Sequence, residues 1–331
     1  MQELKTTPDD SIERHARVSV VVASYNHARF IENCLKSILT QTLLPAELIV
    51  IDDGSKDDSP AIITRTLESA TIPCDLIVRK NRGLCATLNQ GFARAKGEYF
   101  GYLGSDDLWL PDFLAERVKL LELRPNAVLG YGHCFLIDED DRIVDSTADW
   151  ANYSDGSAIA MLLKTIAPMS PTVLYRRSFL DAEPWRIDSR LEDYDLYLRL
   201  ANRGEFAFDP RVLSAWRHHS TNTSHNQQMM LNEQLAALRR AAAELGLSQA
   251  ELDKIEKETR FRRADDFLRY GEKRIAIGLM AANLRGVKLS SSLFKMILRL
   301  IVPYSMMERR KRMKSSSRNE RYGTVRSKMR Y

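Results

Sequence analysis

Short runs of β-branched and aliphatic residues alternate along this chain with segments whose apolar residues recur at helical spacing, beginning at Val18. The runs at 18–22, 47–51 and 98–103 have the length and composition of buried strands, and turn residues stand at each junction. Strands and helices that alternate in this order form a mostly parallel sheet covered by helices. The alternation therefore predicts an α/β fold.

The same pattern continues through the middle of the chain. We expect further strands at 75–78, 127–137, 142–146 and 172–175, and helices at 28–39, from 57, and at 85–95, 111–123, 157–165 and 194–202. Gly97 is expected to cap the helix at 85–95. From about Ser224 the chain is expected to be almost wholly helical, because Ala-rich segments such as 235–245 follow without any cluster of catalytic residue types.

Three of the predicted strands end in polar residues: Ser-Tyr-Asn at 24–26, Asp-Asp-Gly at 52–54 and Ser-Asp-Asp at 105–107. In open α/β sheets the ligand crevice lies at the carboxyl ends of the strands. We therefore expect these three segments to line one ligand site.

Asp106 and Asp107 follow a predicted buried strand and Gly104, so a rigid turn presents two carboxylates together. Mg²⁺ and Mn²⁺ prefer such oxygen ligands. Taken alone, an Asp-Asp pair is more often a solvated turn or a helix cap. Its place beside the other two polar segments favours a metal site that neutralises a leaving diphosphate.

Two further polar segments are candidates for chemistry. Glu192 and Asp193 precede the helix predicted at 194–202, where a carboxylate can act as a general base or can simply cap the helix. Residues 216–224 bring together Arg217, two histidines and several hydroxyls, which suits metal or diphosphate contact or, alternatively, a surface loop.

With these motifs assembled, the chain resembles an inverting family 2 glycosyltransferase of the GT-A fold. The resemblance covers about residues 18–224 and rests on ordered motifs: Val-Val-Val-Ala-Ser-Tyr-Asn at 20–26, Ile-Asp-Asp-Gly-Ser at 51–55, Asn-Arg-Gly at 81–83, Leu-Asn-Gln-Gly at 88–91, Gly-Glu-Tyr at 97–99, Ser-Asp-Asp at 105–107 and Glu-Asp at 192–193. Each motif alone is common, whereas their order and spacing are specific. The resemblance implies a Rossmann-like sheet flanked by helices, with a helical C-terminal extension.

The resemblance also implies roles for individual residues. It makes Asp193 the general base, with Glu192 supporting it or contacting the acceptor, and Asp107 the direct ligand of Mn²⁺ or Mg²⁺. The donor-binding residues that it implies are Ala23, Tyr25, Asp53, Asn89, Asp106 and Arg217. The metal ligands that it implies are Asp107, Asp106 and His219.

The implied reaction is a single in-line displacement. An acceptor hydroxyl attacks the anomeric carbon of a UDP-, GDP- or dTDP-sugar, and the configuration inverts. The acceptor implied is a glycan or a lipid-linked glycan of a bacterial surface polysaccharide or lipopolysaccharide, and the enzyme would be a hexosyl- or related transferase. The alternative is a non-catalytic sugar-nucleotide-binding or scaffold protein of the same fold, against which the joint presence of Asp106, Asp107 and Glu192-Asp193 argues.

The sequence of the C-terminal region predicts that this region contacts a membrane surface. Residues 288–303 resemble an interfacial amphipathic helix, and residues 308–331 carry ten Lys or Arg and two Glu, a net +8 that leaves −3 for the rest of the chain. The alternative is a purely structural role, in which residues 288–303 form a helix packed on the catalytic domain. Nucleic-acid binding is not expected, because the tail has few interleaved aromatic residues.

We expect a cytoplasmic protein on the inner face of the plasma membrane. The first 17 residues lack the apolar run of a signal peptide, no segment reaches the roughly 18 apolar residues of a membrane span, and the four cysteines have no C-x-x-C spacing. The expected organisation is a polar segment (1–17), a catalytic domain (18–224), a helical region (225–303) and a basic tail (304–331).

Overall fold

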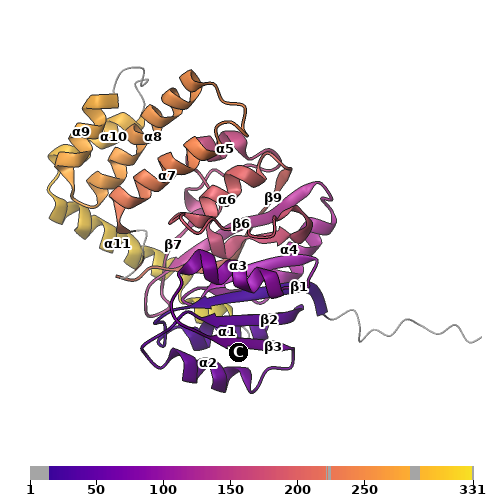
Figure 1. Ribbon diagram of the computed structural model, residues 1–331. Coiled ribbons are helices and arrows are strands. Elements are labelled where there is room, and N and C mark those ends of the chain that lie inside the picture. Colours follow the sequence, from indigo (N-terminus) through magenta and orange to yellow (C-terminus); the bar gives the residue numbers. More distant parts are fainter. Residues whose placement is uncertain (1–14, 221, 223–224, 284–290, 330–331) are drawn as a thin grey trace, which may run out of the picture.

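The computed structural model describes residues 15–220, 222, 225–283 and 291–329, and builds them around one mixed β-sheet (Figure 1). Nine strands form this sheet in the order β3-β2-β1-β4-β8-β6-β9-β5, with β7 paired to β6. The predicted α/β class is confirmed.

The N-terminal half of the sheet is parallel. Its strands are β1 (His15–Ser24), β2 (Leu44–Asp52), β3 (Cys74–Val78) and β4 (Tyr99–Gly104), and its helices are α1 (Ile31–Leu39), α2 (Ser59–Leu67), α3 (Leu84–Arg94) and α4 (Phe113–Glu122). Along β1, Val20 and Val22 face the core shared with α1 and α4, whereas Val21 faces the core shared with α3. Because helices cover both faces, the central strands β1, β2 and β4 are buried over most of their length, whereas the edge strand β3 is partly exposed.

The second half of the sheet mixes parallel and antiparallel pairs. β6 and β9 are parallel, while β8 pairs antiparallel with both β4 and β6 and so joins the two halves. The elements here are β5 (Leu108–Trp109), β6 (Ala127–Ile137), β7 (Ile143–Ser146), α5 (Ile159–Leu163), β8 (Leu174–Arg176), α6 (Glu192–Leu200) and β9 (Glu205–Arg217).

The C-terminal region is helical and packs on one side of the sheet (Figure 1). Its helices are α7 (Gln227–Ala241), α8 (Gln249–Arg269), α9 (Lys273–Asn283), α10 (Ser291–Ile301) and α11 (Tyr304–Tyr322). Asn226 caps α7 through Met229 N, and Ser248 and Glu251 form a capping box on α8. After α11 the chain returns to the sheet beside β7.

Most predicted elements are found with shifted ends, and the strand at 127–137 has the predicted bounds. Two strands, β5 and β9, were not predicted. The prediction for Gly97 was wrong: α3 ends at Arg94, its C-cap Ala95 is extended, and Gly97 instead approaches β1 so closely that a Cβ would lie 2.5 Å from Ser19 N. Residues 1–14 of the polar segment, Ser224 and the beginning of the helix predicted at 288–303 lie outside the described residues.

Candidate active site

Three parallel strands bring their polar ends to one edge of the sheet, as predicted. In the pairing register Ala23 lies opposite Gly104, and Ser24 lies opposite Asp52. Asp53 N donates a hydrogen bond to Ser24 O over 2.8 Å, which continues the pairing past the end of β2. Tyr25, at the same edge, leaves 46% of its side chain exposed.

The two carboxylates at the end of β2 accept hydrogen bonds from the protein itself. Asp52 is fully buried and accepts hydrogen bonds from Ser55 N (2.8 Å) and Ser55 Oγ (2.6 Å). Asp53 accepts hydrogen bonds from Arg82 N (2.9 Å) and Gly83 N (2.7 Å), and Arg79 lies 2.8 Å from it. Asp53 therefore fixes the loop before α3, and its predicted contact with the donor base stays a prediction.

Asp106 lies at the centre of a group that can hold a metal ion. One ligand atom each from His27, Asp106 and His219 lie within 4.8 Å of one another. His219 Nε2 is 2.8 Å from Asp106 Oδ2, and His27 Nδ1 is 3.9 Å from Asp106 Oδ1. His27 was not predicted from the sequence, although it directly follows the Ser-Tyr-Asn segment.

The charge states of this group suit a cation. Burial opposes ionisation of Asp106, but the hydrogen bond with His219 and the charges of both imidazoles outweigh it and lower the pKa of that carboxyl. Burial is the main cause that lowers the pKa of His27. An ionised carboxylate and a neutral imidazole are the forms that bind metals.

Asp107 has a different environment from its neighbour. It is buried, and its Oδ1 accepts a hydrogen bond from Arg217 N over 2.8 Å. Burial, followed by the charge of Asp106, raises the pKa of Asp107 well above its usual range. A Cβ at Gly104 would lie 2.9 Å from Asp106 and 3.1 Å from Asp107, so both carboxylates fold over this glycine. The direct ligation of metal by Asp107 stays a prediction.

Arg217, at the end of β9, ties the Asp106–Asp107 turn to the rest of the domain. Its side chain is almost completely buried and donates to Asp106 O, Asp138 O and Asp141 Oδ1 over 2.7, 2.7 and 2.6 Å. The guanidinium also lies over the Phe30 ring, 4.7 Å from its centroid. The geometry makes Arg217 a support of the turn, and its predicted contact with the donor stays a prediction.

Glu192 and Asp193 form the second carboxylate pair, in the first turn of α6. Both are half-buried, and Asp193 Oδ1 accepts a hydrogen bond from Tyr194 N over 2.6 Å. Burial raises the pKa of Asp193 to about 6, and burial together with the charge of Asp193 raises that of Glu192 to about 8. Such perturbed carboxyl groups are typical of acid–base catalysis.

Asn89 positions the segment that leads into α6. Its side-chain amide donates to Trp185 O over 2.7 Å and accepts from Trp185 N over 3.0 Å. Cys85, one turn earlier on α3, donates to Ser189 O over 3.3 Å. These contacts hold the residues before Glu192 against α3, and the predicted contact of Asn89 with the donor stays a prediction.

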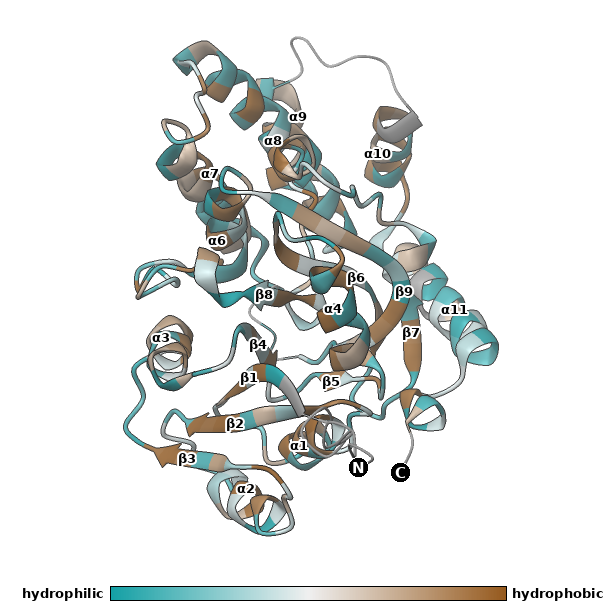
Figure 2. Cartoon of the chain, turned by 90° about the vertical axis from the view of Figure 1, so that its right-hand side faces the viewer, coloured by the Kyte–Doolittle hydropathy of each residue, from teal (hydrophilic) through white to brown (hydrophobic). Residues whose placement is uncertain are grey.

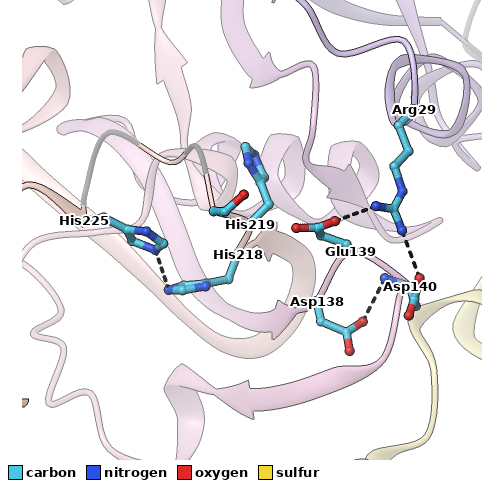
Figure 3. A pocket seen from close by; sticks show the side chains of 8 residues that line it. Arg29, Asp138, Glu139, Asp140, His218, His219 and His225 are labelled. Carbon is cyan, nitrogen blue, oxygen red and sulfur yellow. Dashed lines mark hydrogen bonds and ion pairs between the residues drawn. The ribbon is translucent and has the colours of Figure 1, made fainter. Parts of the chain in front are cut away.

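A cavity of about 480 Å³ opens beside the metal-binding group (Figure 3). His219 lines it and belongs to both. On its other side Arg29 binds the acidic turn before β7, at 2.5 Å from Glu139 and 2.9 Å from Asp140. The cavity is therefore a polar space next to Asp106, large enough for part of a substrate.

Comparison with known proteins identifies the family. The model for glycosyl transferase family 2 matches residues 19–181. An uncharacterised glycosyltransferase of Rickettsia typhi is 30% identical over 221 residues, which are 63% of this chain and 67% of the relative. The chain belongs to glycosyltransferase family 2. Another uncharacterised glycosyltransferase, from a Nostoc strain, is 31% identical over 182 residues, 52% of this chain and 56% of the relative. The chain thus spans about half to two thirds of these relatives.

Solved structures of glycosyltransferases share the fold. A mannosyltransferase from Pyrobaculum calidifontis, in complex with GDP-Man and Mn²⁺, superposes with a TM-score of 0.60 at 18% identity, covering 96% of this chain and 90% of the other. Residues 1–349 of S. aureus TarS, in complex with UDP-GlcNAc, give 0.58 at 18% identity, covering 89% and 91%. The predicted GT-A fold is therefore confirmed, and the glycosyltransferase has a helical C-terminal region.

Proposed function

We propose that this glycosyltransferase moves a hexosyl or related group from a UDP-, GDP- or dTDP-sugar to an acceptor hydroxyl, with inversion and with a divalent cation at Asp106. The observation that carries the proposal is the pairing of two distinct sites. One is the group of His27, Asp106 and His219 at the strand ends, and the other is the carboxylate pair with raised pKa at the start of α6.

The residues present fit a divalent cation. Asp106 supplies a carboxylate of lowered pKa, His219 and His27 supply imidazoles, and Asp107 lies behind them. When bound, the cation would offset the charge that develops on the leaving diphosphate. Because two of the three ligands are nitrogen, we propose Mn²⁺ over Mg²⁺, which prefers an all-oxygen shell. The mannosyltransferase of the same fold was solved with Mn²⁺.

Asp193 is the proposed base. With a pKa of about 6 it is ionised at neutral pH, yet it is a stronger base than an exposed aspartate, so it can take the proton of the acceptor hydroxyl. Glu192, with a pKa of about 8, keeps its proton at neutral pH and can donate a hydrogen bond to the acceptor. Attack on the face opposite the diphosphate inverts the anomeric carbon without a covalent intermediate.

The donor is proposed to lie along the strand ends. Tyr25 is exposed there for stacking on the base, with Ala23 and Asp53 beside it. Asn89 and Arg217 support this site indirectly. Asn89 binds the segment before α6, and Arg217 binds the Asp106–Asp107 turn. Solved structures of this fold hold GDP-Man or UDP-GlcNAc, which supports a nucleotide-sugar donor.

The acceptor is proposed to be a glycan or lipid-linked glycan of a bacterial surface polysaccharide, reached at the inner face of the plasma membrane. No helix in the described ranges is both long and apolar enough to cross a bilayer. Contact with the membrane surface would instead come from the C-terminal helices. We also propose the division into a catalytic domain (18–224), a helical region (225–303) and a basic tail (304–331).

Helix α10 carries the feature that supports membrane contact. Leu293 and Met296 are buried against α8 and α9, yet four large apolar side chains on the adjacent face are exposed. We call this face the outer stripe; its residues and exposed fractions are Phe294 (69%), Ile297 (45%), Leu298 (47%) and Ile301 (76%). Their spacing of i, i+3, i+4 and i+7 makes one continuous apolar surface.

Basic residues on the next helix support the proposal that an anionic membrane covers the outer stripe. Helix α11 lies on the same flank of the molecule in both views and exposes Arg309, Arg310 and Lys314 (Figures 1 and 2). An apolar helix face next to basic side chains fits an anionic bilayer, where the apolar residues enter the headgroup boundary and the cations meet the lipid phosphates. A second copy of this basic surface would be repelled.

A donor screen tests the proposed function. The full chain is incubated with Mn²⁺ and each of several UDP-, GDP- and dTDP-sugars, and both thermal shift and nucleoside diphosphate release are measured. One donor class should stabilise the protein and be turned over in a manner that EDTA stops. Binding without turnover for every donor would instead support the non-catalytic alternative, and turnover in EDTA would refute the role of the cation.

A further inference from the structure

The end of the chain returns to the active-site half of the sheet. We call residues 323–328 the clip. Ile143 N donates a hydrogen bond to Gly323 O over 3.1 Å, and Val325 N donates to Asp141 O over 2.9 Å, on either side of a bridge between Thr324 and Arg142. The clip therefore pairs with the turn before β7 and the start of that strand, more than 180 residues earlier in the sequence.

The clip also enters the apolar core behind the metal-binding group. Val325 is fully buried and packs in a cluster with Leu108 and Ala215. Leu108 directly follows Asp107, and Ala215 lies two residues before Arg217. The Val325 side chain thus supports the two strands, β5 and β9, that carry the residues around Asp106.

A buried carboxylate connects the clip to the site. Asp141 is 4% exposed, and its two oxygens bind two arginines: Oδ1 lies 2.6 Å from Arg217 and Oδ2 lies 2.7 Å from Arg326. Arg217 in turn donates through its guanidinium to the Asp106 carbonyl and through its backbone N–H to the Asp107 carboxylate. A continuous chain of charge-assisted hydrogen bonds therefore runs from the clip to the Asp106–Asp107 turn.

We propose that the clip is a positioning element of the metal site, and that Arg326 is a positioning residue that acts through Asp141 and Arg217. This inference rests on the proposed binding of a cation at Asp106. When Arg326 is present, it holds Asp141 from one side, so that Asp141 presents its other oxygen to Arg217 in one orientation. Without Arg326 the carboxylate can turn, and the support of the Asp106–Asp107 turn loosens.

The chain offers a matched control for Arg326. Arg321 also lies in the C-terminal segment, its side chain is equally exposed at 68%, and it forms an ion pair with an acidic partner, Asp149, at 3.7 Å. Among the described residues Arg321 contacts Asp149 and the Tyr322 ring, not Asp141 or Arg217, so its loss should leave the metal site unchanged. Because both side chains are largely exposed, both alanine variants should fold.

Calorimetric titration of Mn²⁺ into the full chain with UDP or GDP tests the clip. We expect Arg326→Ala to weaken Mn²⁺ binding by about three- to tenfold, the range for a charge-assisted hydrogen bond with one exposed partner. Arg321→Ala should match the wild type, and Arg326→Lys should restore part of the affinity. The melting temperatures of all variants should agree within a few degrees.

Each other outcome has a distinct meaning. An Arg326→Ala variant that binds Mn²⁺ as tightly as the wild type would overturn the proposed role of the clip. Equal weakening by Arg326→Ala and Arg321→Ala would also overturn it, because the effect would then come from the loss of tail charge alone. A wild type that binds no Mn²⁺ would refute the proposed metal site itself. A second variant is the chain ended after Thr324, which removes Val325 and Arg326 together. It should weaken Mn²⁺ binding more than Arg326→Ala does. An unchanged Mn²⁺ affinity in this variant would also overturn the proposed role of the clip.

Discussion

Replacing Asp193 by Asn should abolish sugar transfer and at the same time stabilise the protein. The variant keeps the shape of the side chain and its hydrogen bond from Tyr194 N but cannot accept a proton. Loss of a general base costs about 10²- to 10⁴-fold in kcat. In the wild type, kcat/KM should fall about tenfold for each pH unit below a pKa of about 6 and should level off above it.

The stability effect follows from the same raised pKa. Because the folded-state pKa lies above the value of about 3.8 for an unfolded aspartate, ionisation of Asp193 favours the unfolded chain. The loss of stability begins near pH 4, grows until pH 6 and then stays constant, at a ceiling of about 3 kcal/mol that partial exposure reduces to about 1–2 kcal/mol. Above pH 6, Asp193→Asn should therefore be more stable than the wild type by about this amount.

Two measurements on one preparation check this prediction. Urea denaturation at pH 5 and pH 8 gives the stability difference, and initial rates between pH 5 and pH 9 give the profile. An Asn variant that retains transfer would refute the base assignment, and one that is less stable than the wild type at pH 8 would refute the buried, raised-pKa environment.

Two other variants test the structural core of the enzyme and its membrane contact separately from its chemistry. Asp195 lies two residues from the proposed base, but it is buried among Arg186, Arg199 and Arg240, so Asp195→Asn should lower the free energy of unfolding by about 3–5 kcal/mol, as denaturation would show. Phe294→Ser combined with Ile301→Ser should release the protein from anionic liposomes in a sedimentation assay while leaving turnover of a water-soluble acceptor unchanged. Leu123→Ser, at an equally exposed leucine away from the outer stripe, is its control. Undiminished sedimentation, or a shift from dimer to monomer in light scattering, would show that the outer stripe does not bind lipid.

The N-terminal half of the fold was readable from the sequence because its central strands are largely buried on both faces. Such strands appear as mainly apolar runs like 18–22, and the runs of β1, β2 and β4 end in polar residues that mark the ligand edge. The position of Asp106 followed from this regularity, whereas the Glu192-Asp193 pair was predicted from its place before the helix expected at 194–202. Their roles remain predictions that depend on partners distant in sequence.

Strand β9 escaped prediction for a physical reason. Asp209, Pro210 and Arg211 interrupt its apolar sequence pattern, and a proline within a run argues against a strand. The structure accommodates them through register shifts opposite Gly132 and His133. Because β9 was not predicted, the contact of Arg217 with the Asp106–Asp107 turn could not be predicted either.

The role of His27 depends on contacts that sequence spacing cannot show. It lies in the turn after β1, where Asn26 adopts a positive φ of 54°, and its neighbours Ser105 and Asp106 are nearly 80 residues away. A single histidine after a strand has no spacing pattern that distinguishes a ligand from a surface residue. The tail is similar, because Val325 and Arg326 pack with residues such as Ala215 and Asp141, which lie more than 100 residues earlier in the sequence.

The most direct test of this account is Mn²⁺ binding, followed by electron paramagnetic resonance, in the wild type and in Asp106→Asn, with sugar transfer measured on the same samples. We predict that the wild type binds one Mn²⁺ in the presence of the nucleoside diphosphate of its donor, and that Asp106→Asn loses binding and transfer together. An Asp106→Asn variant that binds Mn²⁺ and transfers sugar as the wild type does would contradict the central claim.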